Sequence, residues 1–314
     1  MRGGGGASGI PRPTGRGGAS GGSSPDVLES LLKKKPKYAA VIWKEFKKNK
    51  PAVAGAVVVI ILLAFAFGAK LISPPSSATT QEIRAKFTAP VAGHIFGTDY
   101  LGRDVLSRIL HGARVSLTMG IIPSVCSLLL GMVFGGAAVY IGGKVESVIM
   151  RICDIMSCIP GILLALAFVA ALGPGLGNVM IAVTVAGIPE LTRYVRSVIL
   201  NIVGLEYIDA ARACGVSGAA IVARHVMPNA AGPLILSVVS NISGMIMIGA
   251  GLSYLGLGIQ PPNPEWGAML AEGQNYFMRA PYLMIVPGLA IFISVLAFNL
   301  MGDGLRDALD PKLR

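Results

Sequence analysis

The sequence predicts an all-α integral membrane protein with about six transmembrane helices. Hydrophobic residues make up 53% of the 314 positions and charged residues only 14%, and the mean hydropathy is +0.67. This composition is too apolar for an ordinary soluble domain. A hydrocarbon core of about 30 Å needs about 20 apolar residues per helix. Six runs are long enough to span it, at 52–72, 115–141, 148–172, 177–200, 230–258 and 282–302.

The N-terminal 51 residues precede the first apolar run. Residues 1–25 are rich in Gly, Ser, Pro and Arg, and such a composition buries too little apolar surface to offset the entropy of ordering, so we expect a disordered tail. Residues 26–51 become amphipathic and lysine-rich, with Trp43 and Phe46 expected at the membrane surface. Run 52–72 then predicts the first transmembrane helix.

The distribution of positive charge predicts the orientation. With a cytoplasmic N-terminus, 20 of the 27 Lys and Arg residues fall in inside segments and six in outside segments, which favours both termini in the cytoplasm. Residues 73–114 then form an extracytoplasmic loop, 115–305 a core of five helices, and 306–314 a cytoplasmic tail. Short helices along the membrane face are expected within 73–114 and 260–281.

Several charges and glycines inside the apolar runs need protein neighbours. Charged residues in the third and fourth runs must sit at an interface or face protein rather than lipid; they are Arg151, Asp154, Glu190, Arg193 and Arg196. Gly131 and Gly135 form a GxxxG pattern in the second run, which is typical of close helix packing.

Motifs for catalysis or cofactor binding are missing from the sequence. There is no HExxH, no GxSxG and no phosphate loop, since Gly142-Gly143-Lys144 lacks both the earlier glycine and a following Ser or Thr. The four cysteines show no CxxC pairing, which argues against a zinc site or a disulfide framework. We therefore expect a non-catalytic chain without a cofactor or metal of its own.

The net charge of +11 does not indicate nucleic-acid binding. Eleven of the 27 Lys and Arg residues precede the first apolar run, where a polybasic stretch is typical of a cytoplasmic anchor against acidic lipid.

The polar segment 201–229, between the fourth and fifth runs, carries the strongest functional signal. Small residues at Ala210 and Ala211 allow a helix to enter a groove on a cytoplasmic partner. Gly215 accepts a left-handed helix end, and Pro228 suits the first turn of the next helix. The alternative interpretation is an ordinary amphipathic linker.

At these residues the sequence resembles the inner-membrane permease family of binding-protein-dependent ABC importers. That family has Glu-Ala-Ala, three residues and Gly in this loop, and here the match is Asp209-Ala210-Ala211, Gly215 and Val226-Met227-Pro228. Segments at 94–108, 252–267 and 299–307 resemble its peptide and nickel branch, in particular the OppC and DppC type of subunit. The resemblance covers about residue 40 to the end and implies the type I permease fold.

The resemblance implies a multi-pass subunit of the bacterial inner membrane that imports dipeptides or oligopeptides. Its implied partners are a second homologous permease, one or two ATPase subunits that bind ATP and Mg²⁺, and an extracytoplasmic peptide-binding protein. The contact with the ATPase would be made by the loop residues Asp209, Ala210, Ala211, Arg212, Gly215 and Pro228. Asp99, Arg103 and Asp104 are expected to order the outside loop by local charge pairing rather than to bind peptide.

Three alternatives stay open at this point. Relatives in the same family import nickel complexes or other small solutes. A secondary transporter would also show several spans, but it predicts ionisable residues near the bilayer midplane, and the candidates here are expected near helix ends. A scaffold membrane protein gives no reason for the Asp-Ala-Ala helix in a cytoplasmic loop.

Overall fold

The computed structural model describes residues 38–309, and the regular structure in this part is helical apart from two isolated β-bridges. The contacts divide the chain into two units, Met1–Val41 and Ile42–Arg314, of which the second contains the long helices. The expected disordered tail 1–25, the first part of the amphipathic segment 26–51 and the last residues of the tail 306–314 lie outside the described residues. The prediction of an all-α fold is confirmed.

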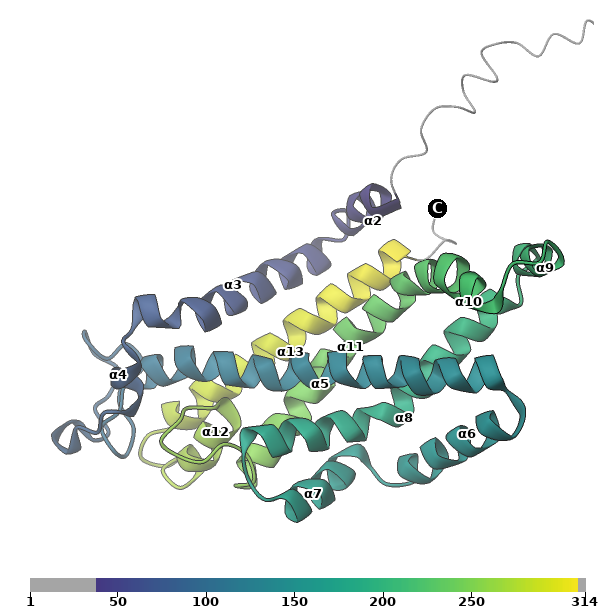
Figure 1. The fold of residues 1–314 in the computed structure, drawn as a ribbon. Coiled ribbons are helices and arrows are strands. Elements are labelled where there is room, and N and C mark those ends of the chain that lie inside the picture. Colours follow the sequence, from purple (N-terminus) through teal and green to yellow (C-terminus); the bar gives the residue numbers. More distant parts are fainter. Residues whose placement is uncertain (1–37, 310–314) are drawn as a thin grey trace, which may run out of the picture. The chain divides into compact units, whose positions relative to one another are not determined.

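Long helices form the frame of the bundle (Figure 1). They are α3 (Lys50–Ile72), α5 (Val105–Ile141), α8 (Leu176–Val203), α11 (Met227–Tyr254) and α13 (Tyr282–Leu309). Shorter helices precede or connect them: α2 (Tyr38–Phe46), α4 (Pro75–Thr79), η1 (Ile83–Ala85), α6 (Gly143–Ser157), α7 (Gly161–Leu172), α9 (Glu206–Ala213), α10 (Gly218–Ile221), η2 (Val222–Val226) and α12 (Trp266–Gln274).

The second unit has two distinct ends. The start of α3 meets the end of α13, where Phe46, Ala52 and Ala308 form one apolar cluster, and α11 begins beside them, because a Cβ on Gly232 would lie 3.2 Å from Leu309 Cδ2. This is the α9 end, since α9 connects α8 to the start of α11 there. The opposite end, where α12 connects α11 to α13, is the α12 end. The segments predicted to be cytoplasmic therefore lie together.

The six expected spans correspond to four long apolar helices, one bent pair of helices and one helix with charged residues. Among residues 38–309, four helices are long and apolar enough to cross a membrane: α3, α5, the continuous helix Val222–Tyr254, and α13. The third run is not one straight helix, because α6 and α7 meet at 90°, with Pro160 preceding α7, where the ring prevents a regular helix from continuing. The fourth run is α8, whose 28 residues include Glu190, Arg193 and Arg196.

The second span begins earlier than expected. Helix α5 starts at Val105 rather than residue 115, because Asp104 caps it, its Oδ2 accepting from Ser107 N at 2.7 Å. The outside loop predicted at 73–114 therefore ends at Asp104. The expectation was wrong because the polar residues within 105–114 are typical of a loop. The cap and contacts within the protein nevertheless stabilise this segment as helix.

Helices α5 and α8 pack at very close range. A Cβ on Gly135 would lie 2.6 Å from the carbonyl oxygen of Thr192, and a Cβ on Gly131 would lie 3.0 Å from the carbonyl carbon of Leu191. No larger side chain fits at Gly135 without moving the backbone of α8. The GxxxG pattern is thus a packing surface, as predicted.

Candidate functional site

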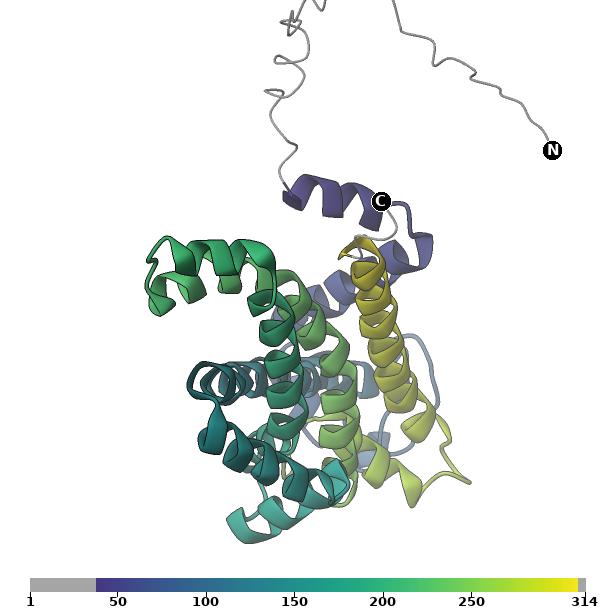
Figure 2. The same ribbon diagram turned by 90° about the vertical axis from the view of Figure 1, so that its right-hand side faces the viewer.

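Helices α9 and α10 with the segment η2 form the loop that the sequence analysis singled out. In Figure 2, α9 and α10, in green at the upper left, extend away from the ends of α8 and α11. Helix α9 has eight residues, too few for stability in isolation. Its position therefore depends on contacts with the rest of the bundle.

One side chain anchors α9. Ile208 is fully buried and belongs to an apolar cluster whose other members come from α8, α10, η2 and α11: Val195, Ile202, Ile221, Val226, Ala230 and Leu234. Burying such a side chain contributes about 1.5–3 kcal/mol. The loop helix thereby shares one apolar cluster with residues of two long helices, α8 and α11.

The end of α9 has the geometry of a Schellman motif. Gly215 has φ +78°, its N–H donates to Arg212 O at 2.9 Å, and Val216 N–H donates to Ala211 O at 3.1 Å. These two bonds satisfy carbonyl groups that the helix leaves free. The prediction that Gly215 ends this helix in a left-handed conformation is confirmed.

Of the remaining predicted residues, Ala211 packs against the cluster that contains Ile208, and the others lie on the exposed side of the loop. Asp209, Ala210 and Arg212 are exposed and Ala211 is half-buried, and Asp209 Oδ1 lies 3.1 Å from Arg212 Nη1. Pro228 is exposed in the first turn of α11. Helix α9 thus presents small side chains and a mutually paired Asp and Arg, while Ile208 faces inward.

Three features of this loop were not predicted from the sequence. Ile208 lacked a local signal, since its importance comes from partners on other helices. Val222–Val226 forms one turn of π-helix, a wide turn that often occurs at functional sites, and Tyr207 is tied to the next helix by Asn229 Nδ2, which donates to its hydroxyl at 3.1 Å.

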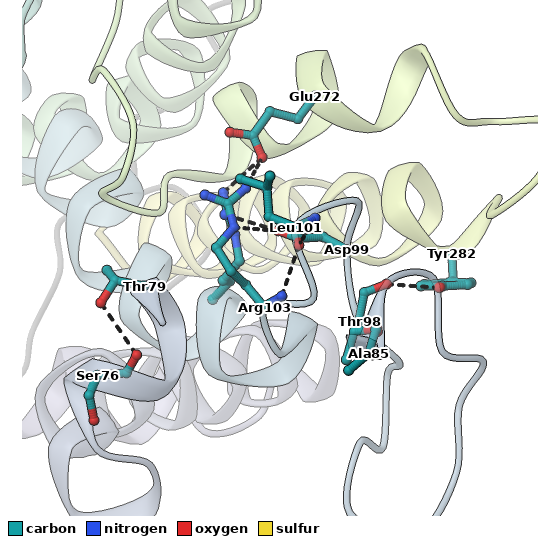
Figure 3. Close-up of polar contacts among 10 residues, drawn as sticks. Ser76, Thr79, Ala85, Thr98, Asp99, Leu101, Arg103, Glu272 and Tyr282 are labelled. Carbon is teal, nitrogen blue, oxygen red and sulfur yellow. Dashed lines mark hydrogen bonds and ion pairs between the residues drawn. The ribbon is translucent and has the colours of Figure 1, made fainter. Parts of the chain in front are cut away.

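A second polar cluster lies at the α12 end (Figure 3). Arg103 Nε donates to Asp99 Oδ2 at 2.6 Å and its Nη2 to Glu272 Oε2 at 2.9 Å. Arg108 bridges the same two carboxylates, at 3.1 Å and 3.0 Å. The four side chains form a closed ring of alternating charge, the Asp99 ring, that fixes α12 to the start of α5.

The Asp99 ring agrees with the expected role of the outside-loop charges. Asp99 and both arginines are buried, so their charges are satisfied within the chain rather than offered to cargo. Asp104, the third expected residue, caps α5 and lies 2.9 Å from His94 Nδ1. The partners Arg108 and Glu272 had not been predicted.

Glu265 caps α12. Its carboxylate accepts from Gly267 N at 2.9 Å, Ala268 N at 2.8 Å and Ser116 Oγ at 3.0 Å. Burial raises the pKa of this carboxyl group, although the three donors favour its charged form. The adjacent Trp266, the first residue of α12, is fully buried and donates from Nε1 to Ile109 O at 3.1 Å. Both Glu265 and Trp266 therefore bind the start of α12 to α5.

The charged residues of α8 divide into paired and unpaired groups. Arg196 pairs with Glu146 of α6, and Arg193 lies 3.4 Å from Asp154 of α6, as expected for charges that face protein. Glu190 is exposed, and its carboxylate makes no hydrogen bond or ion pair with a residue between 38 and 309. It is the fifteenth of 28 residues, so the expectation that the ionisable residues lie near helix ends was wrong for Glu190.

No group of three or more His, Cys, Asp or Glu side chains suited to a metal ion occurs among the described residues. The feature that stands out is the exposed short helix α9, whose buried Ile208 packs in a cluster with residues of α8 and α11.

Two family models match the chain. Residues 127–314 match "Binding-protein-dependent transport system inner membrane component", and residues 37–90 match "N-terminal TM domain of oligopeptide transport permease C". The first model includes the α9 loop, α8 and α11.

Named relatives agree with these models along most of the chain. A glutathione transport system permease protein GsiD from Pectobacterium atrosepticum is 43% identical over 272 residues, which are 87% of this chain and 90% of the relative. A dipeptide transport system permease protein DppC from Alkalihalophilus pseudofirmus is 40% identical and covers 87% and 89%.

The fold is similar to that of a solved importer. An inward-facing structure of the MetNI methionine ABC transporter matches with a TM-score of 0.54 and 19% identity, over 65% of this chain and 98% of the other, which supports the type I permease fold. Taken with the spans and the matched segments, the chain is a multi-pass protein of the bacterial inner membrane and belongs to the family of binding-protein-dependent transport system inner membrane components.

Proposed function

We propose that this chain is one of two permease subunits of an ATP-driven importer of peptides, and that α9 is its contact with an ATPase subunit. The observation that carries the proposal is the construction of the α9 loop. Asp209, Ala210 and Arg212 are exposed while Ile208, on the same short helix, is buried among residues of α8 and α11. A partner that grips the exposed side moves both long helices.

The proposed cycle is alternating access. ATP binding closes the ATPase subunits, the closure displaces α9, and the buried contact of Ile208 carries the displacement into α8 and α11. The spans then open toward the binding protein, which releases its cargo into the path. ATP and Mg²⁺ stay on the ATPase subunits, and this chain contributes no catalytic group.

Peptides are the proposed cargo because the relatives at 43% and 40% identity are named for glutathione and dipeptide transport. Nickel complexes or another small solute are the alternative within the same family. Cargo choice depends on the binding protein as well as on the path, so uptake has to be measured with the complete assembly.

The test is purification of the complex from its host in mild detergent, followed by reconstitution into lipid vesicles with the binding protein. Recovery of a second permease and ATPase subunits, together with ATP-dependent uptake of labelled dipeptide, is the expected result. Recovery of this chain without an ATPase, or uptake driven by an ion gradient instead of ATP, would refute the proposal in favour of a secondary carrier. ATP-driven uptake of nickel and not of peptide would refute the cargo.

A further inference from the structure

Glu190 occupies an unusual position for a carboxylate. Helix α8 has 28 residues, about 42 Å at a rise of 1.5 Å per residue, so Glu190 lies about 20 Å from either end. Its neighbour Leu191 packs against a helix that is long and apolar enough to span, because a Cβ on Gly131 of α5 would lie 3.0 Å from the carbonyl carbon of Leu191. Glu190 therefore lies alongside α5, and it is exposed on the surface of this chain.

The neighbouring arginines do not neutralise Glu190. Arg193, one turn further along α8, directs Nη2 to Ser157 Oγ at 2.6 Å and Nη1 toward Asp154. Arg196 donates from Nε to Glu146 at 2.7 Å. Both guanidinium groups thus turn toward α6, and no described residue pairs with the Glu190 carboxylate.

Lipid is a poor neighbour for this group. A charged side chain in the middle of a membrane is costly, and such residues face protein or a water-filled cavity. The surface of α8 at Glu190 is therefore covered by water or by another polar group when the protein is in its complex.

The other sides of α8 are already occupied. Helix α5 packs against Leu191, α6 binds Arg193, and α11 approaches at Tyr194, whose hydroxyl donates to Pro233 O at 3.2 Å. Because residues three and four apart share a helix face, Glu190 lies one turn before both Arg193 and Tyr194. It lies between these contacts with α6 and α11, and Val183, two turns earlier on the same face of α8, belongs to an apolar cluster with Val169 of α7.

Helix α11 is polar along the same stretch. It contacts α8 at Pro233, through Tyr194, and at Met245, through Gly187. Between these contacts lie Ser240, which is exposed, and Asn241, whose buried Nδ2 has no hydrogen-bond partner among residues 38–309. An exposed carboxylate without a partner among the described residues matches the ammonium group at the amino end of a peptide.

We propose that Glu190 lines the translocation path and binds the amino-terminal ammonium group of the peptide cargo as it crosses the membrane. This inference rests on the proposed function and adds to it the residue that recognises a charged group common to all free peptides.

The experiment uses the reconstituted complex and compares a labelled dipeptide with its des-amino analogue, which lacks the α-amino group. Uptake of both is measured for wild type, Glu190→Gln and the control Glu82→Gln, which makes the same chemical change at an exposed position of the outside loop. Any preference of the binding protein is equal in all three and cancels in the comparison. We expect Glu190→Gln to reduce the preference for the dipeptide by roughly tenfold to a hundredfold and Glu82→Gln to leave it unchanged.

An unchanged preference in Glu190→Gln, with normal uptake by wild type, refutes the inference and leaves the proposed function standing. Absence of ATP-driven peptide uptake in wild type refutes the proposed function itself. A second measurement uses Glu190→Cys in a background without other cysteines: labelling by a charged, membrane-impermeant thiol reagent supports the path. Labelling only by a hydrophobic maleimide, or loss of the second permease from Glu190→Gln during purification, refutes it in favour of a lipid face or a salt bridge between subunits.

Discussion

The anchoring of α9 by Ile208 makes a quantitative prediction for Ile208→Ala. Ile208 is fully buried in a cluster shared by α8, η2 and α11, and Ile→Ala substitutions at such positions cost about 2–5 kcal/mol. Burial of this side chain contributes about 1.5–3 kcal/mol to docking of the helix. The substitution removes most of that contribution, so α9 no longer holds one position against α8 and α11.

The expected result is loss of coupling rather than loss of the complex. ATP hydrolysis continues in reconstituted Ile208→Ala, because the ATPase sites lie on other chains, while the number of peptides imported per ATP hydrolysed falls several-fold. Uptake of labelled dipeptide and release of phosphate, measured on the same vesicles, give this ratio directly.

Ile246→Ala is the matched control. Ile246 has 1% of its surface exposed and packs in the core between α5 and α11, so its loss lowers stability by a similar mechanism without touching the α9 cluster. If both variants lose thermal stability but only Ile208→Ala loses coupling, the anchor is specific. An unchanged ratio of peptide to ATP in Ile208→Ala, or an equal decrease in both variants, refutes the reasoning.

Three further results are expected from the same structure. Gly215→Val places a β-branched residue at φ +78°, which destabilises this backbone conformation by about 1–2 kcal/mol and lowers coupled uptake. Gly215→Asn retains more of the uptake, because Asn tolerates this conformation better. Equal uptake by the two variants would contradict the role of the left-handed helix end. Glu272→Ala leaves Arg103 and Arg108 with one carboxylate, which lowers the free energy of unfolding by about 3–5 kcal/mol. The melting temperature of the complex falls accordingly, and an unchanged melting temperature would argue against the role of the ring. Burial raises the pKa of Glu265 in the folded protein, so its contribution to stability is fully present below its unfolded pKa and declines as the pH rises through its folded pKa. In a pH series, the melting temperature of Glu265→Gln is expected to decline less than that of wild type.

Features that depend on local chemistry could be predicted from the sequence. Gly215 and Pro228 were predicted because turns and helix starts select these residues for backbone reasons. The structure places Gly215 as expected, whereas Pro228 lies in the first turn of α11 but within the continuous helix Val222–Tyr254. The close packing at Gly135 follows from spacing on one helix. The all-α class follows from the apolar runs.

Features that depend on distant partners could not be predicted in the same way. Glu272 is 169 residues from Arg103, and Ile208 has its significance only where α8 and α11 converge. The bend between α6 and α7 had a signal in Pro160, which the continuous apolarity of the run 148–172 concealed. The start of α5 was not predicted as helix because its charged residues, Arg108 among them, are typical of a loop when their partners are unknown.

The two ends of the protein differ in how they respond to ionic strength. Three of the four charged side chains of the Asp99 ring are buried, with Arg103 and Arg108 only 1% and 2% exposed, so dissolved salt screens the ring little. The pair Asp209 and Arg212 on α9 is 69% and 52% exposed and is screened strongly. A concentrated salt wash is therefore a way to loosen whatever binds electrostatically at α9 while the opposite end keeps its shape, and this gives a practical route to prepare the membrane part of the assembly intact.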